Sequence, residues 1–66
     1  MLQALLTTVR GRVKGKGQGK RLSVDGRSFL LLGKNLPKKS GDFIVLGEVL
    51  FNPRLEIRVK QWVEIP

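Results

Sequence analysis

Residues 5–14 read Leu-Leu-Thr-Thr-Val-Arg-Gly-Arg-Val-Lys, and this stretch decides the fold class. Its second half alternates between two kinds of residue, with Val9, Gly11 and Val13 set against Arg10, Arg12 and Lys14. Successive side chains of a β-strand point to opposite faces of the sheet. The stretch therefore predicts a strand with one face turned to the core and a wholly basic outer face.

The remaining sequence repeats this strand signal. Short apolar runs are separated by Gly, Asn, Asp and Pro, and no window of about 12 residues carries a helical stripe. We expect four further strands, at residues 20–24, 27–32, 42–51 and 54–65. The glycines of residues 15–19 predict a mobile loop. The chain is thus expected to be one all-β domain of five strands.

Local signals define the connections between these strands. Asp25-Gly26 predicts a type I′ hairpin turn. Gly47 interrupts the fourth strand, where a bulge or a barrel bend is expected. Pro37, with glycines on either side of residues 34–40, argues against a helix in the connector between the third and fourth strands.

The parity of the fifth strand predicts which of its side chains face outward. One face contains Leu55, Ile57, Val59, Val63 and Ile65, with Gln61 as its polar member. Trp62 falls on the other face with Arg58 and Lys60, so we expect it to be partly exposed. The same reasoning places Phe29 on the Arg27 face of the third strand.

The composition excludes several classes of function. The 66 residues include no Cys and no His, which removes disulfides, thiolate or imidazole metal sites and Cys- or His-based catalysis. The five acids are scattered, and the glycine-rich residues 15–21 lack the P-loop spacing. We expect a protein that is not an enzyme and has no cofactor, metal or small-molecule substrate.

The sequence carries no sign of membrane insertion or export. Residues 1–6 lack the charged start of a secretory signal, and no apolar run approaches the roughly 20 residues that span a bilayer. An amphipathic helix of the kind that binds membrane surfaces is also missing. The expected location is the cytoplasm.

Charge is concentrated in one part of the chain. The net charge is +8, yet residues 10–39 hold ten cations and one acid, while the other segments hold three cations and four acids. Segregated positive charge of this kind indicates a polyanionic partner such as nucleic acid.

Three segments resemble the OB-fold, and more narrowly the small OB domains of the tRNA-anticodon-binding and single-strand-binding type. These segments are residues 9–13 (VRGRV), residues 22–27 (LSVDGR), and residues 41–49 (GDFIVLGEV) followed by residues 55–59 (LEIRV). The chain departs from that family in its connector, which is too short and too proline-broken for the usual capping helix. One barrel end would then be open, covered by residues 1–4, or buried against a second copy. An SH3-like or Sm-like barrel would give a similar strand pattern.

The resemblance implies that ligand lies across the outer face of the second and third strands, beside the loops that join strands one to two and four to five. The basic candidates for this site are Arg10, Arg12, Lys14, Lys16, Lys20, Arg21, Arg27, Arg54, Arg58 and Lys60. Bases of a single strand stack on flat side chains. Phe29 and Trp62 are the stacking candidates, and Phe51 is placed to lean over the same face.

Two functions remain open at this point. The first is sequence-tolerant binding of single-stranded DNA or RNA, between which the sequence does not choose. The second is a protein-interaction or assembly module, either a homo-oligomer or a binder of an acidic protein. The apolar N-terminus, the doubly apolar third strand and the missing capping helix favour the second.

Overall fold

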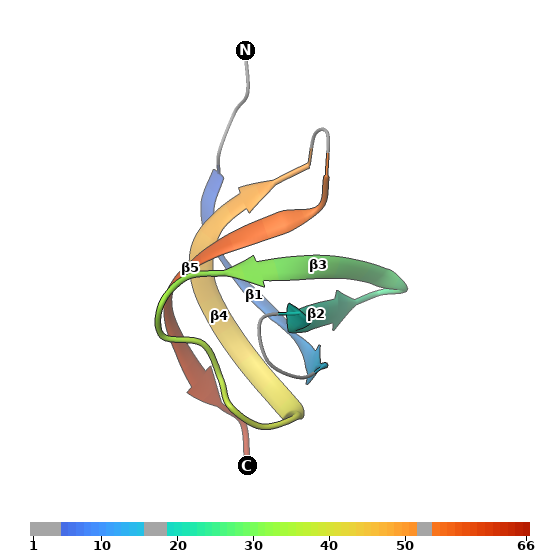
Figure 1. The fold of residues 1–66 in the computed structure, drawn as a ribbon, viewed down its shortest axis with the longest axis vertical. Coiled ribbons are helices and arrows are strands. Elements are labelled where there is room, and N and C mark those ends of the chain that lie inside the picture. The colour runs from blue at the N-terminus through green and yellow to red at the C-terminus, as the bar shows by residue number, and fades with distance from the viewer. Residues whose placement is uncertain (1–4, 16–18, 52–53) are drawn as a thin grey trace.

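The computed structural model describes residues 5–15, 19–51 and 54–66. These residues form five strands with ends within two residues of the expected bounds (Figure 1). The strands are β1 (Leu5–Lys14), β2 (Arg21–Val24), β3 (Arg27–Leu32), β4 (Gly41–Leu50) and β5 (Glu56–Glu64). Within the described ranges, no helix is long and apolar enough to cross a membrane.

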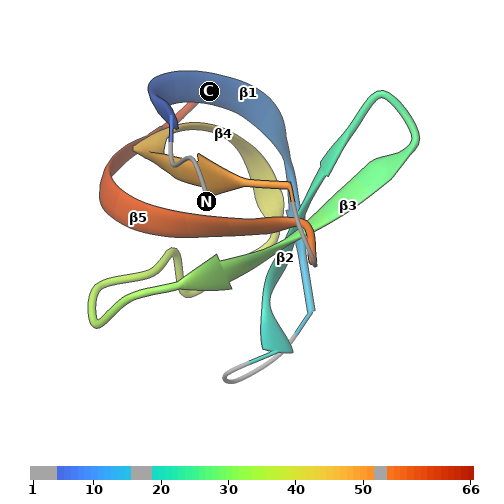
Figure 2. The ribbon, with the colours of Figure 1, turned by 90° about the horizontal axis from the view of Figure 1, so that it is seen from above.

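The five strands close into a barrel in the order β1-β2-β3-β5-β4. β3 and β5 pair in parallel, and the other neighbours are antiparallel. β1 completes the closure because it pairs with β4 along most of its length and with β2 over its last three residues, as the curl of the strands in Figure 2 illustrates. The predicted all-β, five-stranded small barrel is confirmed, and its order is consistent with an OB-like fold.

The close approach of β2 to β1 requires a glycine at position 11. A Cβ atom built on Gly11 would lie 2.5 Å from the backbone oxygen of Ser23 and 2.8 Å from a methyl group of Val24. Only a residue without a side chain lets β2 pass this close over β1. Val13 on the same face is fully buried, whereas Arg12 is exposed. The predicted two faces of β1 are therefore confirmed.

The core lies inside the barrel and is built from all five strands. Its buried apolar side chains are Val13, Leu22, Phe29, Leu31, Phe43, Val45, Val49 and Ile57. Asp25 and Gly26 join β2 to β3 with φ angles of 49° and 79°. Two successive positive φ values are those of a type I′ turn, which matches the expected hairpin.

A bulge interrupts the pairing of β4 with β5. Gly47 pairs with Val59 and Leu46 pairs with Gln61, so Lys60 is an extra residue with no partner on β4. A Cβ atom on Gly47 would collide with the carbonyl oxygen of Arg58. The irregularity expected at Gly47 is confirmed, and its extra residue lies on the partner strand.

The bulge reverses the parity of β5 beyond Val59. Trp62 pairs with the buried Val45 and packs against the core, whereas Val63 pairs with Ile44 and is 57% exposed. The predicted assignment of Trp62 to the outer face and of Val63 to the inner face is wrong, although the partial exposure expected of Trp62 is observed. A strict period of two assumes one residue per partner, and the extra Lys60 breaks that assumption.

The connector packs against one end of the barrel without forming a helix between residues 33 and 40. Pro37 is fully buried, and Leu36 is partly buried against the core. The indole N–H of Trp62 donates a hydrogen bond to the backbone oxygen of Asn35 at 3.0 Å. The connector itself therefore occupies the end that the missing helix was expected to leave open.

We predict that Gly47→Ala destabilises the barrel by about 2–4 kcal/mol, because the added methyl group forces the β4 and β5 backbones apart. For a domain of this size, each kcal/mol lowers the melting temperature by roughly 4–8 °C. Thermal unfolding followed by circular dichroism measures the change. Gly19→Ala is the matched control, since its Cβ atom would meet nothing within 4 Å. Equal melting temperatures for the two variants would contradict the role given to Gly47.

Candidate nucleic-acid interface

Four exposed cations gather on the outer face of β1 and β2. Lys14 lies directly opposite Arg21, and Arg12 lies opposite Ser23, in the antiparallel pairing of these strands. Arg10 precedes Arg12 on the same face of β1. Side chains opposite one another on adjacent strands have Cβ atoms about 5 Å apart. We call Arg10, Arg12, Lys14 and Arg21 the basic patch.

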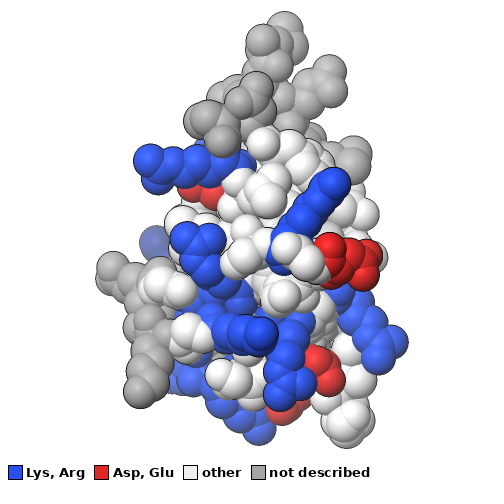
Figure 3. Space-filling model, turned by 90° about the vertical axis from the view of Figure 1, so that its right-hand side faces the viewer, with Lys and Arg blue, Asp and Glu red and all other residues white. Residues whose placement is uncertain are grey.

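Figure 3 views the side of the barrel where β2 turns into β3, and shows Lys and Arg side chains gathered over its lower half. Asp42 is the acid that contacts the basic patch, with an oxygen 3.8 Å from the Arg12 guanidinium. Both side chains of this pair are more than half exposed, so water screens it and it contributes little to stability. The patch therefore retains most of its positive charge.

Charge is distributed unevenly along the patch. A hollow of about 360 Å³ lies beside its upper part, lined by Arg10 and Arg12 but also by Asp25 and Asp42. There the opposite charges balance. Lys14 and Arg21 form no ion pair with another described residue. The Lys14–Arg21 end of the patch is thus the stronger attractor for a phosphate.

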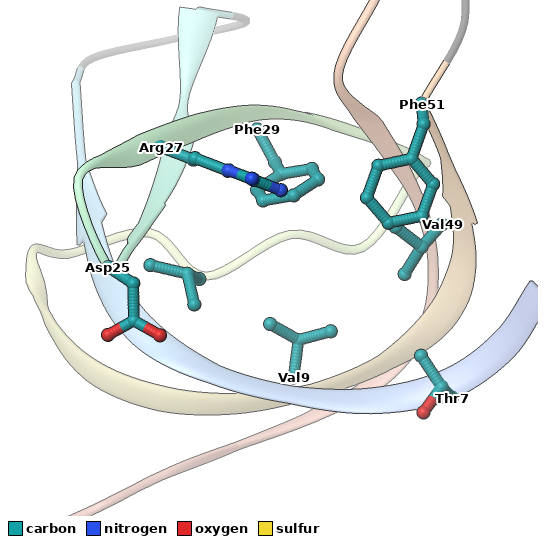
Figure 4. Close-up of a pocket in the computed structure, with 8 residues that line it drawn as sticks. Thr7, Val9, Asp25, Arg27, Phe29, Val49 and Phe51 are labelled. Atoms are coloured by element: carbon teal, nitrogen blue, oxygen red, sulfur yellow. The ribbon is translucent and has the colours of Figure 1, made fainter.

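The other predicted cations of the N-terminal half do not join the patch. Arg27 pairs with Val24 and shares the inward parity of Phe29, so it points toward the mouth of the barrel, away from Arg21 (Figure 4). Lys20 is only 7% exposed. Lys20, a basic candidate of the predicted site, is therefore not exposed for ligand contact, because it precedes β2 with the parity of the inward Leu22. Lys16 lies outside the described residues.

The three predicted cations of the C-terminal half lie elsewhere on the surface. Arg58 is exposed on β5, where it pairs with Leu32 and Glu48. The ammonium group of Lys60 is 3.6 Å from a carboxylate oxygen of Glu48. Arg54 is exposed ahead of β5. Arg58 and Lys60 thus lie near Glu48, and β5 is separated from β1 and β2 by the intervening strands β4 and β3.

The two predicted stacking residues both pack against the core, with Phe29 buried and Trp62 partly exposed. Phe29 is 5% exposed and pairs with the buried Leu22, so its assignment to an exposed face is wrong. The third strand is apolar on both faces, and local sequence could not show which face the barrel would enclose. Trp62 packs edge-on against Phe43, with ring centroids 5.4 Å apart. The outer face thus offers charge without the expected aromatic platforms.

Some exposed apolar side chains lie at positions whose exposure the sequence pattern predicted only in part. Phe51 is 53% exposed after the end of β4, as expected for a side chain that leans over the binding face. It lies at the mouth of the barrel, however, where its ring contacts Phe29. Ile44 and Val63 are cross-strand neighbours, 36% and 57% exposed, beside Arg10. Treating Gly47 as a bulge with an extra residue on β5 would have predicted the exposure of Val63.

We predict that Trp62→Phe lowers the free energy of unfolding by about 1 kcal/mol through loss of the hydrogen bond to Asn35. It should leave the affinity for oligonucleotides unchanged, because the ring is turned inward. Urea unfolding measures the first quantity and fluorescence anisotropy of a labelled oligonucleotide measures the second. A variant of unchanged stability that binds oligonucleotides more weakly would show that Trp62 contacts the ligand.

The arrangement of these groups suits attraction of a polyanion. Among the residues described, no three Asp or Glu side chains gather in a way that could hold a metal ion. Comparisons of the chain with protein-family models, with curated proteins and with solved structures found no match. The functional argument therefore depends on the geometry of the basic patch and the barrel.

Proposed function

We propose that this protein is a non-enzymatic module that binds single-stranded DNA or RNA with little sequence preference. The observation that carries the proposal is the juxtaposition of Lys14 and Arg21, flanked by Arg12 and Arg10, on adjacent strands of the barrel. The strand order and the sequence resemblance to OB-fold nucleic-acid-binding domains support it in part. Such domains bind oligonucleotides across the second and third strands and at the loop between strands one and two, and Lys14 and Arg21 lie at the two ends of that loop.

The affinity arises mainly from electrostatics. Each phosphate neutralised by a cation releases counterions, so the logarithm of the binding constant falls linearly with the logarithm of the salt concentration. With about 0.7 counterions released per phosphate of a single strand, four contacts give a slope of roughly −3. Dissociation constants for binding of this type are about 10⁻⁴ to 10⁻⁶ M at physiological salt.

Little sequence preference follows from the composition of the basic patch. Contacts to phosphates fix the position of a strand but carry no base information. The described residues that pair with the four cations across β1, β2 and β4 include no aromatic side chain. The patch therefore recognises the backbone, and any preference for particular bases must arise elsewhere on the barrel.

We predict that Lys14→Glu combined with Arg21→Glu weakens binding of a labelled single-stranded oligonucleotide at least about tenfold at low salt and flattens the salt dependence. The reason is that two phosphate contacts become repulsive. Fluorescence anisotropy at several salt concentrations gives both quantities, and a duplex of equal length tests whether single strands are preferred.

The matched control is Lys34→Glu combined with Lys38→Glu, which makes the same change in net charge on the connector, where both side chains are exposed. This control should bind more tightly than the patch variant. If both double variants lose equal affinity, net charge alone explains binding and the basic patch is not the interface.

A second candidate function, assembly with another copy of the chain, is favoured by one observation. Ile44 and Val63 form an exposed apolar pair on β4 and β5. Adjacent exposed apolar side chains mark interaction surfaces when they form part of a larger patch.

For this candidate we predict that Val63→Lys converts an oligomer into a monomer without unfolding it, because the position is already exposed. Sedimentation velocity at high and low salt is the measurement, with Lys34→Glu as the surface control. A wild-type chain that sediments as a monomer at the highest soluble concentration would exclude self-association.

A further inference from the structure

The barrel has an open mouth at the end where the β2–β3 hairpin meets the end of β4. A cavity of about 380 Å³ lies there, and we call it the mouth pocket. Its walls include Val9, Val49, Phe29 and Phe51, and its rim carries Asp25 and Arg27 (Figure 4). A volume of this size is at the lower end of the range for small-ligand sites. The pocket thus combines apolar walls with a charged rim.

Two phenylalanine rings define the shape of the mouth pocket. Phe29 is buried, whereas Phe51 is 53% exposed. Their centroids are 6.0 Å apart with an interplanar angle of 81°, so the edge of one ring meets the face of the other. In Figure 4 the Phe51 ring stands at one side of the opening. Half of the Phe51 side chain is thus accessible, and an accessible aromatic ring is a group on which a planar ligand can stack.

Arg27 adds a charged hydrogen-bond donor to the pocket that Phe51 lines. It precedes Phe29 by two residues on the same face of β3, and Figure 4 shows its side chain extending toward Phe29 over the mouth. No described acid forms an ion pair with it. A guanidinium group is planar, stacks on aromatic rings and donates up to five hydrogen bonds. An aliphatic ligand would cover this charge without a partner, which is unfavourable.

The mouth pocket is continuous with the surface that carries the basic patch. Val24 and Asp25 line both the mouth pocket and the hollow beside Arg10 and Arg12. Only the β2–β3 turn separates the two. A strand whose phosphates lie along the patch can therefore turn one base around Asp25 into the mouth of the barrel.

We propose that the mouth pocket accepts a single unstacked nucleobase, which stacks on Phe51 and receives hydrogen bonds from Arg27. This inference rests on the proposed function, because the base enters as part of a bound single strand. Unstacked bases are recognised in this manner, by aromatic or guanidinium planes on their faces and by polar groups on their edges. The pocket holds one base, so the rest of the strand is bound through its backbone.

The test compares the wild-type chain with Phe51→Ala on two labelled oligonucleotides, one normal and one in which every base is removed. The wild type should bind the abasic strand about tenfold more weakly than the normal one, since stacking contributes to each bound base. Phe51→Ala should bind the normal strand about tenfold more weakly than the wild type does. Phe51→Ala should bind the abasic strand almost as tightly as it binds the normal strand. Removing the ring and removing the base break the same contact, so the two losses of affinity are not additive.

Two variants act as controls. Leu6→Ala removes an exposed apolar side chain of similar exposure that does not line the mouth pocket, and it should bind like the wild type. Phe51→Leu keeps the apolar contact with Phe29 but loses the aromatic ring, so it should behave like Phe51→Ala while remaining folded by circular dichroism. The salt dependence should be unchanged in all three variants, because none alters a phosphate contact.

The outcomes distinguish the two proposals. If Phe51→Ala and Phe51→Leu bind the normal strand as tightly as the wild type, the mouth pocket takes no base and only this inference fails. The same holds if the abasic strand loses equal affinity in all proteins. If the wild type binds neither strand at low salt, single-strand binding itself is wrong, and the inference is overturned with it.

Discussion

The barrel depends on one steric constraint at position 47. Any side chain there would collide with the backbone of β5. Because Gly47 has no Cβ atom, β4 can approach Arg58 closely enough to accommodate an extra residue, Lys60, on the neighbouring strand. A bulge of this kind bends its strand and increases the local twist. Closing a sheet of only five strands requires such strong bending, and Gly11 on the neighbouring strand β1 permits a similarly close approach of β2.

The bulge also decides which chemistry the C-terminal strand presents. It turns Trp62 into the barrel, where the indole packs on Phe43 and its N–H reaches the connector. It turns Val63 out to solvent beside Ile44. Without the extra residue these two side chains would exchange places. The surface would then carry an indole that could stack on bases, and the connector would lose its hydrogen-bond donor.

The sequence predicted the features that depend on local pattern. The five strands, the Asp25-Gly26 turn and the two faces of β1 all follow from alternation and turn chemistry, which neighbouring residues determine. It did not predict features that depend on strand partners. The parity of Trp62 depends on pairing with β4, and the burial of Phe29 depends on which side of an all-apolar strand the barrel encloses.

The same distinction explains why the cations of the candidate site were easier to predict than its aromatic residues. A charged side chain at an alternating position of β1 has one stable location, which is the solvent. A phenylalanine can serve in the core or on the surface, and a chain of 66 residues has few large side chains with which to fill a barrel. Phe29 and Phe43 are used in this core, and Trp62 packs against it. Phe51 is the aromatic residue that remains half exposed.

The basic patch carries a thermodynamic implication of its own. Like charges directly opposite one another on adjacent strands destabilise a sheet, and Lys14 faces Arg21 across β1 and β2. Both side chains are exposed, so water screens this repulsion and its cost in the free barrel is small. A phosphate placed between the two side chains would convert their repulsion into two attractions. Binding and folding are then coupled, because any ligand that binds only the folded state shifts the equilibrium toward it. The cross-strand pair that weakens the free barrel is thus the pair that a polyanion would stabilise most.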